Sequence, residues 1–194
     1  MYIIVSKGGV VVWYLLALLL LSQGLSHVDM IYAGTTPQSS DWDCALACAE
    51  TLLTWAGIGP QPHLWQEILE PGRPIPFLHL RQYFAAHQLQ AVGYRLTWGA
   101  LSRFLEGHSG APLLAHLDEG SGHFVLIWGI TPAGVLTGDP AHGVHLVPAE
   151  TFQTLWTGAC LYFPQLGSMP GAIQAGEEAQ NRIRLLTAAG LARP

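Results

Sequence analysis

The sequence has few charged residues, few cysteines and no cluster of basic residues. Only 11% of its 194 residues are Asp, Glu, Lys or Arg, and half are apolar. This composition does not fit a highly solvated, disordered chain. The formal net charge is −5 and the eight Lys and Arg are scattered along the chain, so no basic patch is available to a nucleic acid. We therefore expect a globular protein with no nucleic-acid partner.

The three cysteines, Cys44, Cys48 and Cys160, are too few and too odd in number for a disulfide framework. The absence of a CxxC pair argues against a zinc ribbon or a thioredoxin-type centre. Four histidines could be taken for metal ligands: His108, His116, His142 and His145. They have no Cys or Glu partners at suitable spacing, so we expect neither a metal nor another cofactor.

One long apolar run is present, and it lies near the N-terminus. Residues 10–21 read VVVWYLLALLLL and follow Lys7, which is typical of a signal peptide. The small residues at 22–24 make a poor cleavage site, and with residues 3–5 the stretch approaches the roughly 20 residues that span a bilayer. Two alternatives therefore stay open for residues 1–24: a cleaved signal peptide or a membrane anchor. Both predict an extracytoplasmic domain, either periplasmic or secreted, or anchored to the inner membrane.

The rest of the chain predicts one domain with helices first and strands later. Residues 25–36 are a polar linker, and residues 166–194 form a tail in which 177–189 could be a helix. Asp43 or Asp41 can cap a helix that runs to about Trp55 and ends at Gly57. Further helices are expected at 63–68, 78–87, 97–108 and 148–158, and strands at 91–96, 112–117, 123–130, 135–140, 144–148 and 159–163. This order indicates an α+β domain over residues 37–165 rather than alternating βαβ units.

The stretch PQSSDWDCALACAE, residues 37–50, places Cys44 in the first turn of a helix, where a thiolate is favoured. A cysteine nucleophile also needs a base, a group that orients the base, and donors for the oxyanion. His123 begins one strand and Asp139 ends the next, so both lie at the same end of the sheet. A one-residue slip in register would turn Asp139 to the other face. The Gln38 amide could join the Cys44 N–H as an oxyanion donor.

In this order, Gln38, Cys44, His123 and Asp139 resemble the site of papain-like cysteine peptidases. The motifs are similar to those of double-glycine leader peptidases that serve bacteriocin exporters. The matching pieces are Pro37-Gln38, Asp43-Cys44, HFVL at 123–126, DPAHG at 139–143, and Phe152, Trp156 and Gly158. The resemblance covers residues 30–165. It implies a papain-like fold, with N-terminal helices packed on a C-terminal antiparallel sheet, and an endopeptidase with Cys44, His123, Asp139 and Gln38 as catalytic residues.

The resemblance further implies cleavage after a Gly-Gly-type pair in an exported or surface-assembled protein, beside a secretion machine. The chain departs from the family in two ways. Ala45 stands after the cysteine where the family has a glycine. The chain also has no G-x-x-x-x-G-K-[ST] loop and no set of six membrane spans. We therefore do not expect the usual peptidase–transporter fusion. Two other functions stay open, a substrate-binding module that does not cleave and an acyltransferase on the same scaffold.

Simpler structural roles compete for each of these residues. The role of Asp139 could be limited to starting the turn at Pro140, because Asp-Pro begins turns routinely. Gln38 could simply be a polar residue of a loop, and His123 could be a structural histidine at the end of a strand. Cys48 and Cys160 are expected to be core residues.

Overall fold

The computed structural model describes residues 32, 34–66, 73, 75–108 and 111–188. The chain divides into two units, and the described residues all belong to the second, residues 32–194. The predicted signal peptide or anchor at 1–24 and most of the predicted linker at 25–36 lie outside the described residues. Within the described ranges, no helix combines the length and the apolar character needed to cross a bilayer.

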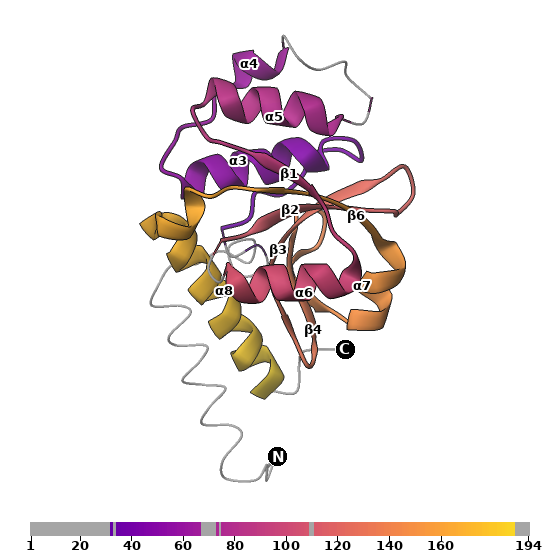
Figure 1. The fold of residues 1–194 in the computed structure, drawn as a ribbon. Helices are drawn as coiled ribbons and strands as arrows, with labels where there is room; N and C mark the ends of the chain where they lie inside the picture. The colour runs from indigo at the N-terminus through magenta and orange to yellow at the C-terminus, as the bar shows by residue number, and fades with distance from the viewer. Residues whose placement is uncertain (1–31, 33, 67–72, 74, 109–110, 189–194) are drawn as a thin grey trace, which may run out of the picture. The chain divides into compact units, whose positions relative to one another are not determined.

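The second unit is an α+β domain in which helices come first and most strands follow (Figure 1). Its elements are α3 (Cys44–Trp55), α4 (Pro62–Gln66), α5 (Phe77–Ala86), β1 (Val92–Arg95), α6 (Trp98–Gly107), β2 (Leu113–Leu117), β3 (His123–Thr131), β4 (Gly134–Asp139), β5 (Gly143–Val147), α7 (Ala149–Leu155), β6 (Trp156–Tyr162), the 3-10 turn η1 (Leu166–Ser168) and α8 (Pro170–Ala188).

The six strands form one antiparallel sheet in the order β1-β6-β2-β3-β4-β5. One face, with Phe124, Leu126 and Trp128 of β3, packs against α3, α5 and α8. The other face, with Val125 and Ile127, packs against α6 and α7. Because β3 is buried on both faces, its sequence is a continuous apolar run rather than an alternating one. The predicted helices-on-sheet architecture is confirmed, with α6 and α7 covering the second face.

A bulge in β3 determines on which face of the sheet Asp139, at the end of β4, lies relative to His123. Gly129 pairs with Leu136, but the next pair is Ile127 with Thr137, so Trp128 is the extra residue. Because side chains alternate along a strand, this shift by one residue puts Asp139 on the same face as His123. Without the bulge, Asp139 would lie opposite Leu126 and on the other face. The register that the sequence leaves open is therefore resolved by one irregular residue.

Two predicted boundaries are wrong. The helix expected over 148–158 ends at Leu155, and β6 begins at Trp156 because the chain there pairs with β2. The C-terminal helix begins at Pro170 rather than at 177. Its first half packs closely: Ala172, Ala175 and Ala179 are 0%, 6% and 0% exposed.

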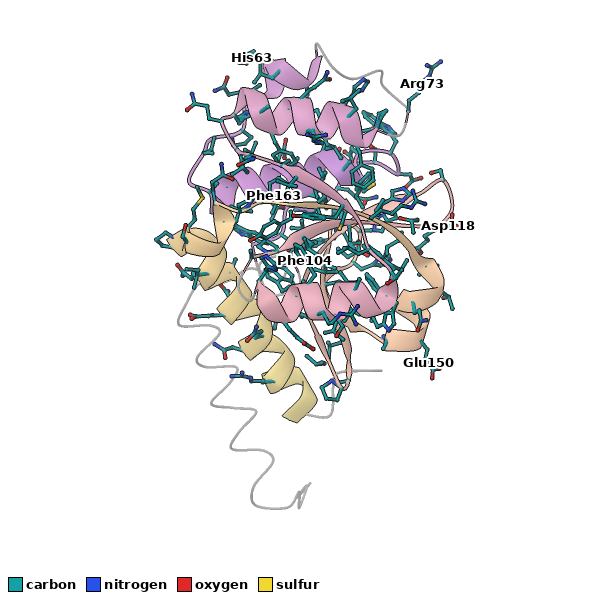
Figure 2. All side chains as sticks on the ribbon, in the orientation of Figure 1. His63, Arg73, Phe104, Asp118, Glu150 and Phe163 are labelled. Atoms are coloured by element: carbon teal, nitrogen blue, oxygen red, sulfur yellow. The ribbon has the colours of Figure 1, made fainter. Side chains whose placement is uncertain are left out.

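Aromatic residues join the sheet to α5. Phe163, just after β6, packs edge-on against Phe84 with ring centroids 4.6 Å apart. Figure 2 shows Phe163 inside the domain, whereas Asp118 and Glu150 lie at its surface. The sheet is thus joined to α5 by a buried apolar core. His123 and Asp139 lie at the end of the sheet where β3 begins and β4 ends.

Candidate active site

Cys44 is the first residue of α3, at the end of the loop that Gln38 opens. Asp43 occupies the N-cap position, but its carboxylate does not bond to the helix. It accepts hydrogen bonds from the backbone N–H groups of Ser39 and Ser40 and from the Ser39 hydroxyl. The predicted capping role of the Asp43 side chain is therefore wrong, because the loop that leads to Cys44 competes for the same carboxylate. Asp43 fixes that loop instead.

His123 lies between Cys44 and Asp139. Its Nε2 is 3.0 Å from Asp139 Oδ1, and its side chain also hydrogen-bonds that of Cys44. Because Nε2 faces the carboxylate, Nδ1 is the imidazole nitrogen left to exchange a proton with the Cys44 thiol. The side chains of His123 and Asp139 are 12% and 8% exposed, so these contacts are largely shielded from solvent. A thiol, an imidazole and a carboxylate that lie next to one another in this order can generate a thiolate and store its proton on the imidazole.

The charges of the site change two pKa values in opposite directions. Burial alone would lower the pKa of His123, but its hydrogen bonds to Asp139 and Cys44 outweigh burial and raise the pKa to about 10. Burial alone would raise the pKa of Asp139, but the hydrogen bond and charge of His123 hold it well below its usual range. The arrangement therefore favours an imidazolium next to an ionised carboxylate.

Asp139 also forms the turn between β4 and β5. Its Oδ1 accepts from the backbone N–H groups of Ala141, at 2.7 Å, and His142, at 3.3 Å. Its Oδ2 is 3.1 Å from Nδ1 of His142. The turn-forming role and the contact with His123 are thus two functions of one carboxylate.

Gln38 is tied to the same turn through its backbone. Its N–H donates to Pro140 O at 2.8 Å, and its side-chain Nε2 donates to Ser40 O at 3.0 Å. The loop before Cys44 and the hairpin that carries Asp139 are therefore directly connected. The Gln38 amide has a second N–H besides the one that is bound to Ser40 O.

A small cavity of roughly 180 Å³ lies beside Cys44. Its lining is mostly apolar and is made by Asp41, Trp42, Cys44, Ala45, Ile75, Pro76, Phe77, His116, Ser121, Gly122 and Phe124. Two residues shape its wall. Gly122 has a φ of +98°, and a Cβ there would lie 2.6 Å from Nε2 of His116. The close approach to the imidazole thus requires glycine.

His116 is held in that wall by several contacts. Its Nδ1 is 3.3 Å from the Thr157 hydroxyl, and its ring packs against Phe77 and Phe124. Burial lowers the pKa of its imidazole. The sequence alone suggests only a possible metal-ligand role for His116 and does not single out Gly122. The available signal is the pair Gly-His at 122–123, which places a glycine directly before the strand.

The other two cysteines lie in the core. Cys48 is 0% exposed and its thiol donates to Phe124 O at 3.4 Å, and burial raises its pKa well above the usual range. Cys160 is 1% exposed, and burial raises its pKa to about 12. The prediction that both are core residues is confirmed, and all three cysteines are free thiols. Among the described residues, no group of three His, Cys, Asp or Glu side chains is placed to hold a metal ion.

Comparison with known proteins identifies one family. The model of the Peptidase C39 family matches residues 33–165. No curated protein sequence matches the chain significantly.

Three solved structures share the fold. A double glycine motif protease from an AMS/PCAT transporter, in complex with the leader peptide, is 24% identical, with 66% of this chain and 89% of that chain covered and a TM-score of 0.54. The second structure is the peptidase domain of Streptococcus ComA, a bi-functional ABC transporter involved in a quorum sensing pathway. It is 18% identical, with 66% of this chain and 95% of that chain covered and a TM-score of 0.59. A C39-like peptidase from Bacillus anthracis is 16% identical, with 69% of this chain and 96% of that chain covered and a TM-score of 0.52.

Proposed function

This chain belongs to the Peptidase C39 family and is a cysteine peptidase of papain-like fold, and from this we propose that Cys44 is its nucleophile, His123 its base and Asp139 the residue that orients the base. The observation that carries the proposal is the position of His123, with Nε2 at 3.0 Å from Asp139 and a second hydrogen bond to Cys44. Three residues from α3, β3 and β4 meet there.

In the first half of the reaction, the Cys44 proton resides on Nδ1 of His123, and the thiolate attacks the carbonyl carbon of the scissile bond. The carbonyl electrons move to its oxygen, where the Cys44 backbone N–H and the Gln38 amide stabilise the negative charge. Collapse of this intermediate breaks the C–N bond. The Nδ1 proton of His123 passes to the leaving amine, and the N-terminal fragment remains as a thioester on Cys44.

In the second half, water replaces the amine product. His123 takes a proton from the water, whose oxygen attacks the thioester carbonyl and releases a carboxylic acid. Cys44 leaves as the thiolate and His123 keeps the proton for the next cycle. Throughout, Asp139 holds the imidazole with Nδ1 directed at the sulfur and stabilises its positive charge.

We further propose that the peptide is cut after a Gly-Gly-type pair. The cavity beside Cys44 has a volume of roughly 180 Å³, and aromatic and imidazole groups line its wall. The methyl group of Ala45 adds to this wall. The structural similarity to a double glycine motif protease supports this specificity, whereas a cavity of this volume would by itself also admit an aliphatic side chain.

The substrate we propose is an exported or surface-assembled protein with a small-residue site in its leader or linker. The peptidase domains of the AMS/PCAT transporter and of ComA belong to transporters, which supports a partner of that kind here. The N-terminal apolar run at 10–21 supports an extracytoplasmic position, as a secreted, periplasmic or inner-membrane-anchored domain.

A peptide series tests the activity. The full chain is incubated with 20-residue peptides that differ only in the two residues before the scissile bond: Gly-Gly, Gly-Ala, Ala-Ala and Val-Gly. We expect cleavage of Gly-Gly and Gly-Ala, weak cleavage of Ala-Ala and none of Val-Gly, all of it lost in Cys44→Ala. Cleavage that survives in Cys44→Ala would contradict the nucleophile. Tight binding of Gly-Gly without cleavage would point to a binding module, and peptide transfer to an added amine would point to an acyltransferase.

The location has its own test. Mass spectrometry of the native protein shows whether residues 1–24 are retained, and fractionation with protease treatment of intact cells shows on which side the domain lies. We expect the domain outside the cytoplasmic membrane. A domain protected in intact spheroplasts would contradict this part of the proposal and leave the peptidase activity unaffected.

A further inference from the structure

Asp139 contacts a second imidazole besides that of His123. Nδ1 of His142 lies 3.1 Å from Oδ2 of Asp139, on the opposite side of the carboxylate from His123. His142 is the fourth residue of the stretch DPAHG at 139–143, and its side chain is 68% exposed whereas that of Asp139 is 8% exposed. The buried carboxylate is thus reached from the solvent side by a histidine that the reaction as described does not use.

The two carboxylate oxygens have different partners. Oδ1 accepts from Nε2 of His123 and from the backbone N–H groups of Ala141 and His142. For Oδ2, among the described residues, the hydrogen-bond partner is Nδ1 of His142. Among the described residues, Oδ2 is therefore held by a side chain alone, whereas Oδ1 also accepts from two backbone N–H groups. Rotation of the carboxylate about its Cβ–Cγ bond would change the contact of Oδ1 with His123.

We propose that His142 is a positioning residue of the peptidase: by donating Nδ1–H to Oδ2 it holds the Asp139 carboxylate in the rotation that directs Oδ1 at His123. This inference rests on the proposed roles of His123 and Asp139. It requires the neutral tautomer with the proton on Nδ1, or the protonated ring, since both donate from that nitrogen.

The surroundings of His142 are suited to such a role. The turn that carries it is anchored on both sides, since Pro140 O accepts from the Gln38 N–H and Ala141 O accepts from the Tyr32 hydroxyl. Apart from Asp139, the titratable group facing His142 is His145 of β5, with ring centroids 6.2 Å apart. His145 is itself engaged, because its Nδ1 lies 3.0 Å from Gly143 O. The backbone of the turn thus stays in place when the His142 side chain is changed.

The test compares His142→Ala and His142→Asn in the full chain. The Asn amide can donate to Oδ2 from nearly the position of Nδ1, whereas Ala cannot. His108→Ala is the matched control, because His108 is also exposed and also bonds through Nδ1, to Phe104 O at 2.8 Å in α6. The Gly-Gly peptide is the substrate, and kcat, KM and thermal midpoint are measured from pH 6 to 10.5.

We expect His142→Ala to lower kcat about 3- to 10-fold, because a hydrogen bond to a charged group that is partly open to solvent contributes modestly. KM should not change, and the loss of activity at alkaline pH, where His123 gives up its proton, should begin at lower pH. His142→Asn should restore both, and His108→Ala should match the wild type. A wild-type kcat and alkaline limb in His142→Ala would overturn the proposal, as would an Asn variant as impaired as the Ala variant.

Alkylation separates this inference from the proposed function. The rate of Cys44 carboxymethylation by iodoacetate, an anion that a protonated His123 attracts, is measured against pH without any peptide. If the wild type cleaves no peptide but its alkylation profile shifts in His142→Ala and returns in His142→Asn, the proposed substrate is wrong and the positioning role holds. If cleavage depends on Cys44 but both profiles are insensitive to His142, the positioning role is wrong and the proposed function holds.

Discussion

Replacing Asp139 by Asn should move the alkaline limit of activity. The substitution keeps the size of the side chain and an oxygen that can accept from Nε2 of His123, so the imidazole should keep its place. It removes the negative charge that, with Cys44, raises the pKa of His123 to about 10. Since the reaction requires a protonated His123 to supply the leaving amine with a proton, the pH at which His123 loses its proton sets the alkaline limb.

The size of the shift follows from the geometry. A carboxylate in hydrogen-bond contact with an imidazolium accounts for about 1 to 3 pKa units, or about 1.4 to 4 kcal/mol. Burial, which lowers the pKa of His123, and Cys44, which raises it, are both retained in the variant. We therefore expect the pKa of His123 to fall by about 1 to 3 units in Asp139→Asn.

The assay is kcat/KM for the Gly-Gly peptide between pH 5 and 11. The wild type should stay active up to about pH 10. In Asp139→Asn the alkaline limb should lie about 1 to 3 units lower, with a reduced plateau. An alkaline limb at the wild-type pH in this variant would refute the assignment of Asp139 as the partner of His123.

Stability gives a second readout of the same pair. The raised pKa of His123 contributes stability that is complete below its unfolded value of 6.5 and is lost as pH rises through about 10. The lowered pKa of Asp139 contributes stability that is complete above its unfolded value of 3.8 and is lost at lower pH. Both describe one interaction. The free energy of unfolding of the wild type should therefore exceed that of Asp139→Asn by the largest amount between pH 3.8 and 6.5. This difference should vanish above about pH 10.

Three further substitutions test other parts of the site. Gln38→Ala should lower kcat about 100-fold or more and leave KM nearly unchanged, because an oxyanion donor acts in the transition state; an equal loss in kcat and in peptide affinity would contradict that role. Gly138→Ala should cost about 1 to 3 kcal/mol in urea unfolding, since its Cβ would lie 2.6 Å from the Trp128 ring, and it should also lower activity; a fully stable variant would mean that the bulge adapts. Cys48→Ala should keep its activity and its reaction with iodoacetate, because Cys48 is 0% exposed; loss of the label would show that the wrong thiol was assigned.

Much of the fold could be predicted because the signals are local. The apolar run at 123–130 indicated a strand covered on both faces, and it is β3 (His123–Thr131). The polar turn before Cys44 and the glycine at 57 indicated a helix between them, and α3 is Cys44–Trp55. Each of these depends on the residues within about one turn or one strand, so no long-range information was needed.

What could not be predicted depends on contacts between distant segments. The facing of Asp139 follows from the bulge at Trp128, a residue that looks like any other in an apolar strand. Trp128 is displaced where its ring packs on Trp55 of α3, with ring centroids 5.3 Å apart. Likewise, the early start of α8 reflects the packing of Gly171 on the Trp55 backbone, where a Cβ would lie 2.5 Å from the carbonyl oxygen. Neither contact leaves a local pattern in the sequence.

The central claim is that Cys44 forms a covalent bond with its substrate, and one measurement tests it directly. The full chain is mixed with the Gly-Gly peptide, quenched in acid within milliseconds to seconds, and analysed by intact mass and peptide mapping. The account predicts a species heavier by the N-terminal fragment minus water, mapped to Cys44, released by hydroxylamine and absent in Cys44→Ala. Peptide cleavage without this adduct under every quench time, or an adduct that persists in Cys44→Ala, would contradict the account.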